Sequence, residues 1–188
     1  MSFTPYGNIL GGVYLVDGKS ANVVGVDSST QTIQTIDYAH HEIHDGSYFK
    51  ASATSDLSIN NTLDFLLVTP NTTKWGHFFF TVENESEADM KVYEANVLTS
   101  NGTAVSAINK NRNSATTASI TAFLYPSIGS TGSQIYTWHS GSGRGGGGSD
   151  RNDDEWILKQ NSNYLMRITA TAAGWVAIRA AWYEHTSK

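Results

Sequence analysis

The sequence predicts an all-β protein, an antiparallel β-sandwich that is most specifically a jelly roll, with an extended N-terminal segment. Apolar residues recur with period two in many short runs rich in Val, Ile, Thr and aromatic residues, as on a half-buried pleated surface. No segment of about 11 to 18 residues carries a sustained apolar stripe at helical spacing with capping signals, so little helix is expected. Short strands without intervening helices favour two antiparallel faces that enclose one core.

The first 34 residues differ in texture from the rest of the chain. Their two candidate strands, residues 12–16 and 22–26, are separated by turn formers such as Asp17 and Gly18 and are too small to bury much surface alone. We therefore predict an N-terminal arm or attachment segment over residues 1–34 and one β-sandwich domain over residues 35–188. A chain of 188 residues has room for one such core.

Six candidate strands follow, separated mostly by turn formers. They are residues 47–53, 63–69, 75–82, 90–98, 116–125 and 135–139. The next stretch, residues 140–150, is rich in glycine, which favours a flexible, solvent-exposed coil. This stretch lacks the Lys-Ser or Lys-Thr pair that ends a phosphate-binding P-loop, so nucleotide binding is not expected.

Two strands are expected at the C-terminus, residues 164–171 and 175–184. The short connection between them predicts an antiparallel hairpin. In the second strand, alternation separates one face from the other; the first face holds Val176, Ile178, Ala180 and Trp182, and the second holds Trp175, Ala177, Arg179, Ala181 and Tyr183. Both faces are rather apolar, so this strand is predicted to be central in its sheet.

The composition limits the classes of function. Charged residues make up only 15% of the chain, the formal net charge is −5 and the pI is near 5.6, so no nucleic-acid partner is expected. The absence of cysteine excludes disulfides and thiolate chemistry. No apolar run approaches the roughly 18 residues of a membrane span, and the start of the chain lacks a signal-peptide pattern. Synthesis in a cytoplasm, with no membrane partner, is expected.

Residues 40–45 offer the strongest candidate for site chemistry. If this segment is extended, His40, Glu42 and His44 point to one side and could hold a structural metal ion. The spacing does not fit a zincin helix, because His41 and His44 are only three residues apart. The alternative, which we favour, is that the histidines form hydrogen bonds in a subunit contact or at a strand edge, with no cofactor.

Other polar and aromatic groups favour structural roles. The acidic residues within 83–89 and 150–155 are expected in solvated turns, with calcium binding as the alternative. A triad can be assembled on paper around His185, but no G-x-S-x-G turn accompanies it, so the protein is not expected to be an enzyme. Most tryptophans are expected to be buried, with a sugar-stacking platform as the alternative.

Five short segments, taken together, carry a resemblance to a known family of proteins. They are residues 35–46 (TIDYAHHEIHDG), 69–72 (TPNT), 109–114 (NKNRNS), 155–159 (EWILK) and 182–185 (WYEH). Read together, they resemble a family of structural proteins of tailed-bacteriophage virions, of the head-decoration or auxiliary-capsid type. The resemblance spans most of residues 35–185 and includes the glycine-rich stretch before residue 155. Residues 1–34 match less distinctly.

The resemblance implies a non-enzymatic virion component and offers no catalytic residues. Its expected form is a decoration protein that binds the major capsid protein on the capsid surface as a symmetric oligomer, with a homotrimer as the specific hypothesis. Residues 1–34 and the segment near residues 40–45 would then face the capsid or neighbouring subunits. The candidate interface residues are Tyr38, His40, His41, His44 and Arg112. The main alternative is a fibre or receptor-binding domain that recognises a host-surface glycan.

Overall fold

The structure, a computed structural model, describes residues 12–16, 21–25, 38–141, 145–148 and 155–186. The chain divides into two compact units, residues 1–41 and 42–188. In the first unit, β1 (Gly12–Val16) and β2 (Ala21–Gly25) form an antiparallel hairpin at the two positions where short strands were predicted. The predicted domain boundary after residue 34 lies outside the described residues. Helix α1 (Tyr38–Asp45) spans the division between the units.

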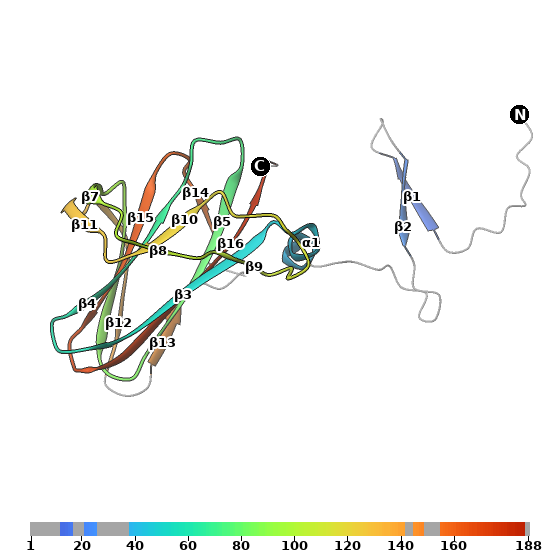
Figure 1. The fold of residues 1–188 in the computed structure, drawn as a ribbon. Coiled ribbons are helices and arrows are strands. Elements are labelled where there is room, and N and C mark those ends of the chain that lie inside the picture. Colours follow the sequence, from blue (N-terminus) through green and yellow to red (C-terminus); the bar gives the residue numbers. More distant parts are fainter. Residues whose placement is uncertain (1–11, 17–20, 26–37, 142–144, 149–154, 187–188) are drawn as a thin grey trace, which may run out of the picture. The chain divides into compact units, whose positions relative to one another are not determined.

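The second unit is an antiparallel β-sandwich, which confirms the predicted all-β class (Figure 1). One layer, here called the β16 sheet, has the order β13-β5-β16-β3-β9, with β14 also pairing with β5. Its strands are β3 (Tyr48–Leu57), β5 (Trp75–Asn84), β9 (Ile108–Asn109), β13 (Gly145–Gly148), β14 (Trp156–Leu158) and β16 (Gly174–His185).

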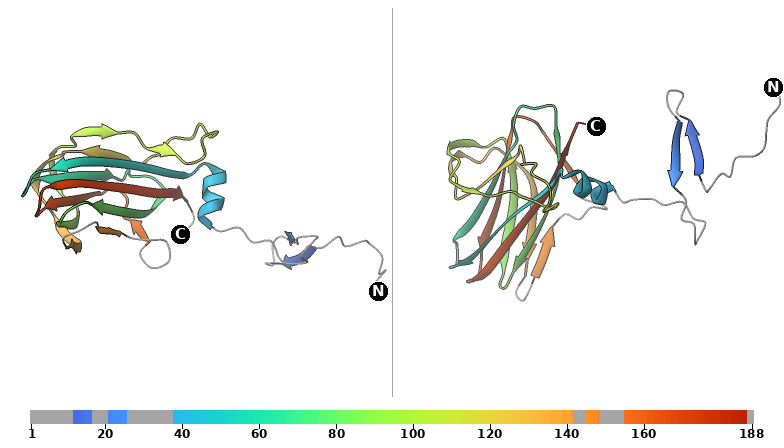
Figure 2. Two further views of the ribbon diagram at one scale, coloured as in Figure 1. Left: turned by 90° about the horizontal axis from the view of Figure 1, so that it is seen from below. Right: turned by 45° about the vertical axis from the view of Figure 1, so that its right-hand side comes forward.

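The opposite layer, the β15 sheet, has the order β12-β6-β15-β4-β10-β8. Its strands are β4 (Thr62–Val68), β6 (Ala88–Glu94), β8 (Thr103–Val105), β10 (Thr121–Leu124), β12 (Ser133–Ser140) and β15 (Asn163–Ala170). Figure 2 shows the same two layers from two further directions. A separate two-stranded ribbon consists of β7 (Val97–Ser100) and β11 (Ser127–Ser130).

The core lies between the two sheets and is built from alternate residues of both. It includes Phe49, Phe78, Phe80 and Trp182 from the β16 sheet and Leu63, Phe65, Met90 and Met166 from the β15 sheet. The predicted division of β16 into two faces is confirmed, and the structure shows which face is inward, because Val176, Ile178, Ala180 and Trp182 are all 3% exposed or less. The predicted central position of this strand is also confirmed, since β16 lies between β5 and β3.

The predicted hairpin of the last two strands is wrong. Strand β15 pairs with β4 and β6, whereas β16 pairs with β3 and β5 in the opposite sheet. The connection at residues 171–173 therefore crosses from one layer to the other. A short turn-forming link can join the two strands either as a hairpin in one sheet or as a crossover between the two sheets. The crossover forms here because each strand pairs with strands much earlier in the chain.

The flexible coil predicted for the glycine-rich stretch is also wrong over Gly145–Gly148. These residues form β13, which pairs antiparallel with Thr81–Asn84 of β5. An edge strand leaves its backbone N–H and C=O groups unpaired, and pairing with them requires no side chain. The remaining residues of the stretch beyond 141 lie outside the described part of the chain.

The predicted strands 90–98 and 116–125 are interrupted. The first is divided between β6 and β7 at Ala95, which has φ of 59°, and the second is confined to β10, which ends before Tyr125 with φ of 53°. Ala95 lies beside Gly132, and Tyr125 lies beside Gly102; both glycines also have positive φ. The paired strands bend at these two points, so β7 and β11 leave the plane of the β15 sheet.

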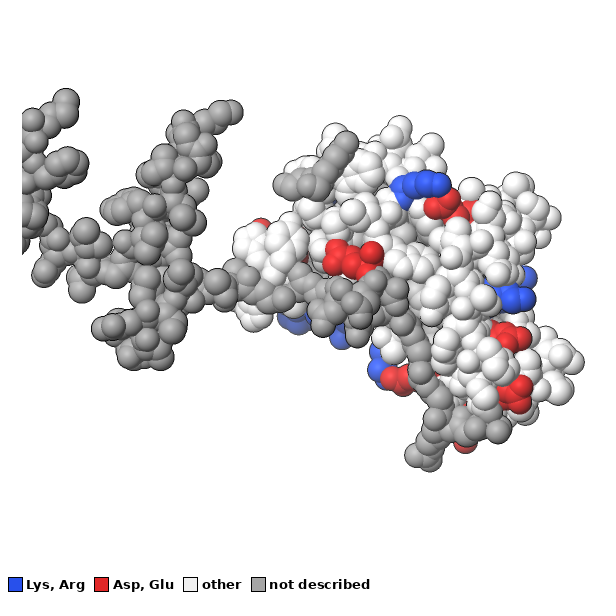
Figure 3. All heavy atoms as spheres, turned by 180° about the vertical axis from the view of Figure 1, so that it is seen from behind, with Lys and Arg blue, Asp and Glu red and all other residues white. Residues whose placement is uncertain are grey.

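Charged side chains are sparse on the surface. On the face shown in Figure 3, small groups of Lys, Arg, Asp and Glu residues are scattered over a mostly uncharged surface. Among the described residues, no helix combines the length and the apolar character needed to span a membrane.

Candidate functional site

The segment considered as a metal site is helical, so the extended geometry on which that hypothesis depended is not present. Helix α1 ends in a Schellman arrangement, in which Gly46 N donates to Ile43 O and Ser47 N donates to Glu42 O, with φ of 73° at Gly46. At about 100° of rotation per residue, Glu42 lies on the side of the helix opposite to His40 and His44.

The helix separates the three predicted ligands in burial as well. Glu42 is buried and accepts a hydrogen bond from Ser47 Oγ, whereas His40 and His44 are exposed. The described residues contain no group of three or more His, Cys, Asp or Glu side chains arranged to hold a metal ion.

The five candidate interface residues are all exposed: Tyr38, His40, His41, His44 and Arg112. The ring of Tyr38 stacks on that of His41, with 6.2 Å between centroids. Farther along α1, the backbone oxygen of His44 accepts a hydrogen bond of 3.0 Å from Asn111 Nδ2. The loop that carries Arg112 therefore lies beside the C-terminal end of α1. Contact of these residues with a partner stays a prediction.

The outer face of the β16 sheet carries a different set of residues, defined by strand register. Trp175 of β16 lies opposite Asp56 of β3 on one side, and on the other its backbone oxygen accepts a 2.8 Å hydrogen bond from Glu85 N. In the next row outward-pointing Ala177 lies between Thr54 of β3 and Glu83 of β5. Residues directly opposite each other on neighbouring strands point to the same side of a sheet.

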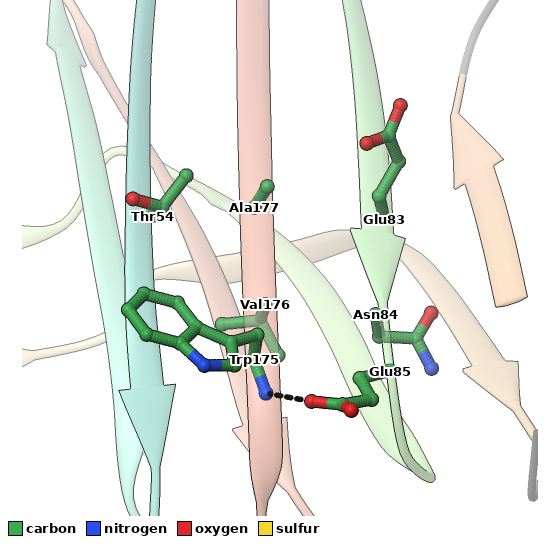
Figure 4. Close-up of a pocket in the computed structure, with 7 residues that line it drawn as sticks. All are labelled: Thr54, Glu83, Asn84, Glu85, Trp175, Val176 and Ala177. Carbon is green, nitrogen blue, oxygen red and sulfur yellow. Dashed lines mark hydrogen bonds between the residues drawn. The ribbon is translucent and has the colours of Figure 1, made fainter. Parts of the chain in front are cut away.

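A hollow of 460 Å³ lies on this face (Figure 4). It is lined by Thr54, Glu83, Asn84, Glu85, Trp175, Val176 and Ala177. In Figure 4 the Trp175 indole extends from β16 toward β3, while Glu83 and Glu85 project from the β5 side. The methyl side chain of Ala177 leaves the space between them open.

The charges around the hollow are partly paired. Arg179, one row beyond Ala177, donates two hydrogen bonds to the Glu83 carboxylate, at 2.6 and 3.0 Å. Beyond it, Lys50, Lys110 and Arg179 border a second hollow of 300 Å³. The ammonium of Lys110 lies 3.9 Å from the centroid of the Tyr48 ring, and burial together with Lys50 lowers the Lys110 pKa.

The other end of the same face holds a cluster of rings and one carboxylate. The His77 ring stacks on Tyr183 and on His185, with centroid distances of 4.6 and 4.5 Å. Glu155 contacts His77 Nδ1 and accepts a hydrogen bond from the Tyr183 hydroxyl. Burial and neighbouring His77 lower the pKa of His185, although Glu42 and Glu155 oppose this shift. The cluster anchors the start of β14 to β5 and β16.

Comparisons of the chain with protein-family models, with curated proteins and with solved structures give no match.

Sequence reasoning recognised only part of this face. Alternation in β16 separated Trp175 from the inward face, but its neighbours on β3 and β5 are more than 80 residues away in sequence. Glu83 was expected in a solvated turn, yet it belongs to β5 and pairs with Arg179. The run of Glu at alternate positions, 83 and 85, carried the signal that these side chains share one face.

Proposed function

We propose that this protein is a non-enzymatic structural component of a tailed-bacteriophage virion. Its most specific form is a capsid decoration protein that binds the major capsid protein on the head surface as a symmetric oligomer, with a homotrimer as the expected state. The observation that carries the proposal is the order of strands in the sandwich. The similarity of five sequence segments to such proteins supports it.

The strand order supports a jelly roll. Four antiparallel pairs are nested along the chain: β3 with β16, β4 with β15, β5 with β14, and β6 with β12. Successive pairs alternate between the β16 sheet and the β15 sheet. A long antiparallel ribbon that is rolled around one core has this order. Jelly rolls recur in viral capsid proteins and in lectins.

The division of the chain into two units supports an attachment role. Residues 1–41 form a unit that contains the β1–β2 hairpin, and residues 42–188 form the sandwich. A protein that decorates a particle needs a contact segment and a compact displayed body, and symmetric oligomers add avidity when each subunit makes one weak contact. The exposed residues at α1 and Arg112 are candidates for subunit or capsid contacts.

The test uses purified virions stripped of the protein, onto which the full chain and a variant lacking residues 1–34 are rebound. We expect the full chain to cosediment with the particles and to scatter light as a trimer, while the variant keeps its circular dichroism spectrum but fails to bind. A stable monomer that binds no virion, or undiminished binding by the variant, would contradict the proposal.

A second candidate is a fibre or receptor-binding domain that recognises a host-surface glycan. The exposed Trp175 beside an open hollow favours it. Electron microscopy of virions labelled on this protein distinguishes the two, because a head protein labels the capsid at many sites and a fibre protein labels the tail.

A further inference from the structure

We propose that the hollow beside Trp175 on the outer face of the β16 sheet binds a neutral saccharide. The inference deepens the second candidate function but does not depend on the location of the protein, because a head protein and a fibre protein can each hold a sugar.

Trp175 is the group that indicates a ligand. It is 56% exposed, whereas Trp182 on the opposite face of the same strand is fully buried and Trp75, Trp138 and Trp156 are half-buried. An exposed indole offers a rigid apolar surface that loses little conformational entropy on binding. The C–H face of a pyranose ring is a flat apolar surface of matching size.

Polar side chains near the indole can form hydrogen bonds with the hydroxyl groups of a sugar. Asp56 and Glu85 flank Trp175 in register, and Thr54 and Glu83 flank Ala177 in the next row. Carboxylates accept hydrogen bonds only, so they suit the hydroxyl donors of a sugar, while the Thr54 hydroxyl can also donate. A volume of 460 Å³ accommodates a small ligand. The combination of one stacking surface with a few polar groups is typical of orientation-specific ligand sites.

The charges select a neutral ligand. Of the three carboxylates, Glu83 forms a two-point ion pair with Arg179, and Glu85 accepts a 3.3 Å hydrogen bond from the uncharged Trp175 N (Figure 4). The charges of Asp56 and Glu85 therefore leave a net negative charge around the indole. Like charges brought together in a site are unfavourable, so sialic acid, uronic acids and phosphorylated sugars are disfavoured.

The position of the hollow argues against a peptide. Strand β16 is paired on both sides, with β3 and with β5, so its backbone offers no unpaired edge for an added strand. The volume of the hollow, 460 Å³, is also in the range of small-molecule sites. A sugar of one or two rings fits both constraints.

The test screens the full chain against an array of neutral and anionic oligosaccharides and then titrates the best neutral binder while the Trp175 indole N–H resonance is followed by NMR. We expect neutral binding with a shift of that resonance. Trp175→Ala should weaken binding about tenfold or more, as truncation of an aromatic anchor does. Ala177→Leu, which keeps the indole but fills the hollow, should weaken it similarly. Tyr125→Ala, at a side chain with a matching 54% exposure elsewhere, should leave affinity within twofold.

Three results would overturn the inference: no neutral oligosaccharide bound by the full chain, binding restricted to anionic sugars, or affinity unchanged in folded Trp175→Ala and Ala177→Leu variants. Virion rebinding by the same variants is measured separately. If the Trp175→Ala and Ala177→Leu variants lose sugar binding but still bind virions, the hollow is the sugar site. If the unaltered chain fails to bind virions, that result contradicts the capsid proposal and leaves the sugar site unaffected.

Discussion

At the scale of single residues, the end of β16 shows how one buried carboxylate organises a loop. Glu184 is 3% exposed, and its oxygens accept hydrogen bonds from Ser119 N at 3.1 and 3.0 Å, Ile120 N at 3.0 Å and Trp182 Nε1 at 2.9 Å. The Ser119 hydroxyl donates to it as well. A buried carboxylate is tolerated because these donors replace water, and the segment before β10 is held against the core in return.

Glu184→Ala should lower the free energy of unfolding by about 3 kcal/mol, because several buried donors lose their acceptor at once. Urea denaturation measures the change. Asp56→Ala, which removes an exposed carboxylate from β3, is the control and should change stability by less than about 0.5 kcal/mol. Equal effects of the two substitutions would show that the network around Glu184 contributes little.

At the scale of elements, the two bends in the paired strands depend on glycine. Gly132 has φ of 65° and Gly102 has φ of 86°, a region that residues with a side chain rarely adopt. A Cβ added at Gly132 would lie 2.2 Å from Glu94 O, and one at Gly102 would lie 2.2 Å from Leu124 O. In both cases the obstacle is backbone, which cannot rotate away, so the ribbon β7–β11 is tied to these positions.

Gly132→Ala and Gly102→Ala should each destabilise the protein by about 2 kcal/mol or more, from backbone strain and the clash with a carbonyl oxygen. Thermal unfolding followed by circular dichroism tests this. Gly141→Ala is the matched control, since a Cβ there meets nothing within 4 Å. If all three variants have the same melting temperature, the bends do not require glycine.

At the scale of the whole molecule, the sandwich is one nested ribbon. Beyond the four pairs of the two main sheets, β7 pairs with β11 and β8 with β10, so the nesting continues toward the middle of the chain. The first strand of the sandwich, β3, pairs with its last, β16. Pairing β3 with β16 therefore requires contacts between segments that are distant in sequence, which are entropically costly to form.

Removal of residues 174–188 should abolish cooperative folding, because β16 lies in the middle of its sheet and supplies Trp182 to the core. Removal of residues 1–34, which belong to the other compact unit, should leave the melting temperature of the sandwich nearly unchanged. Amide NMR dispersion and calorimetry of both truncations provide the measurement. A folded protein without β16, or an unfolded one without residues 1–34, would refute this account.

Local sequence patterns were enough to predict the all-β class, the approximate positions of most of the longer strands, the two faces of β16 and the scarcity of helix, because alternation and β propensity are local properties of the chain. They did not determine which strands pair. The crossover between β15 and β16 and the strand formed by Gly145–Gly148 were mispredicted, and the helix that contains His40 and His44 was not predicted, since the alternatives have similar local energies. Only the tertiary structure brought Asp56, Thr54, Glu83 and Glu85 around Trp175, because a site on a sheet is assembled across strands that lie far apart in sequence.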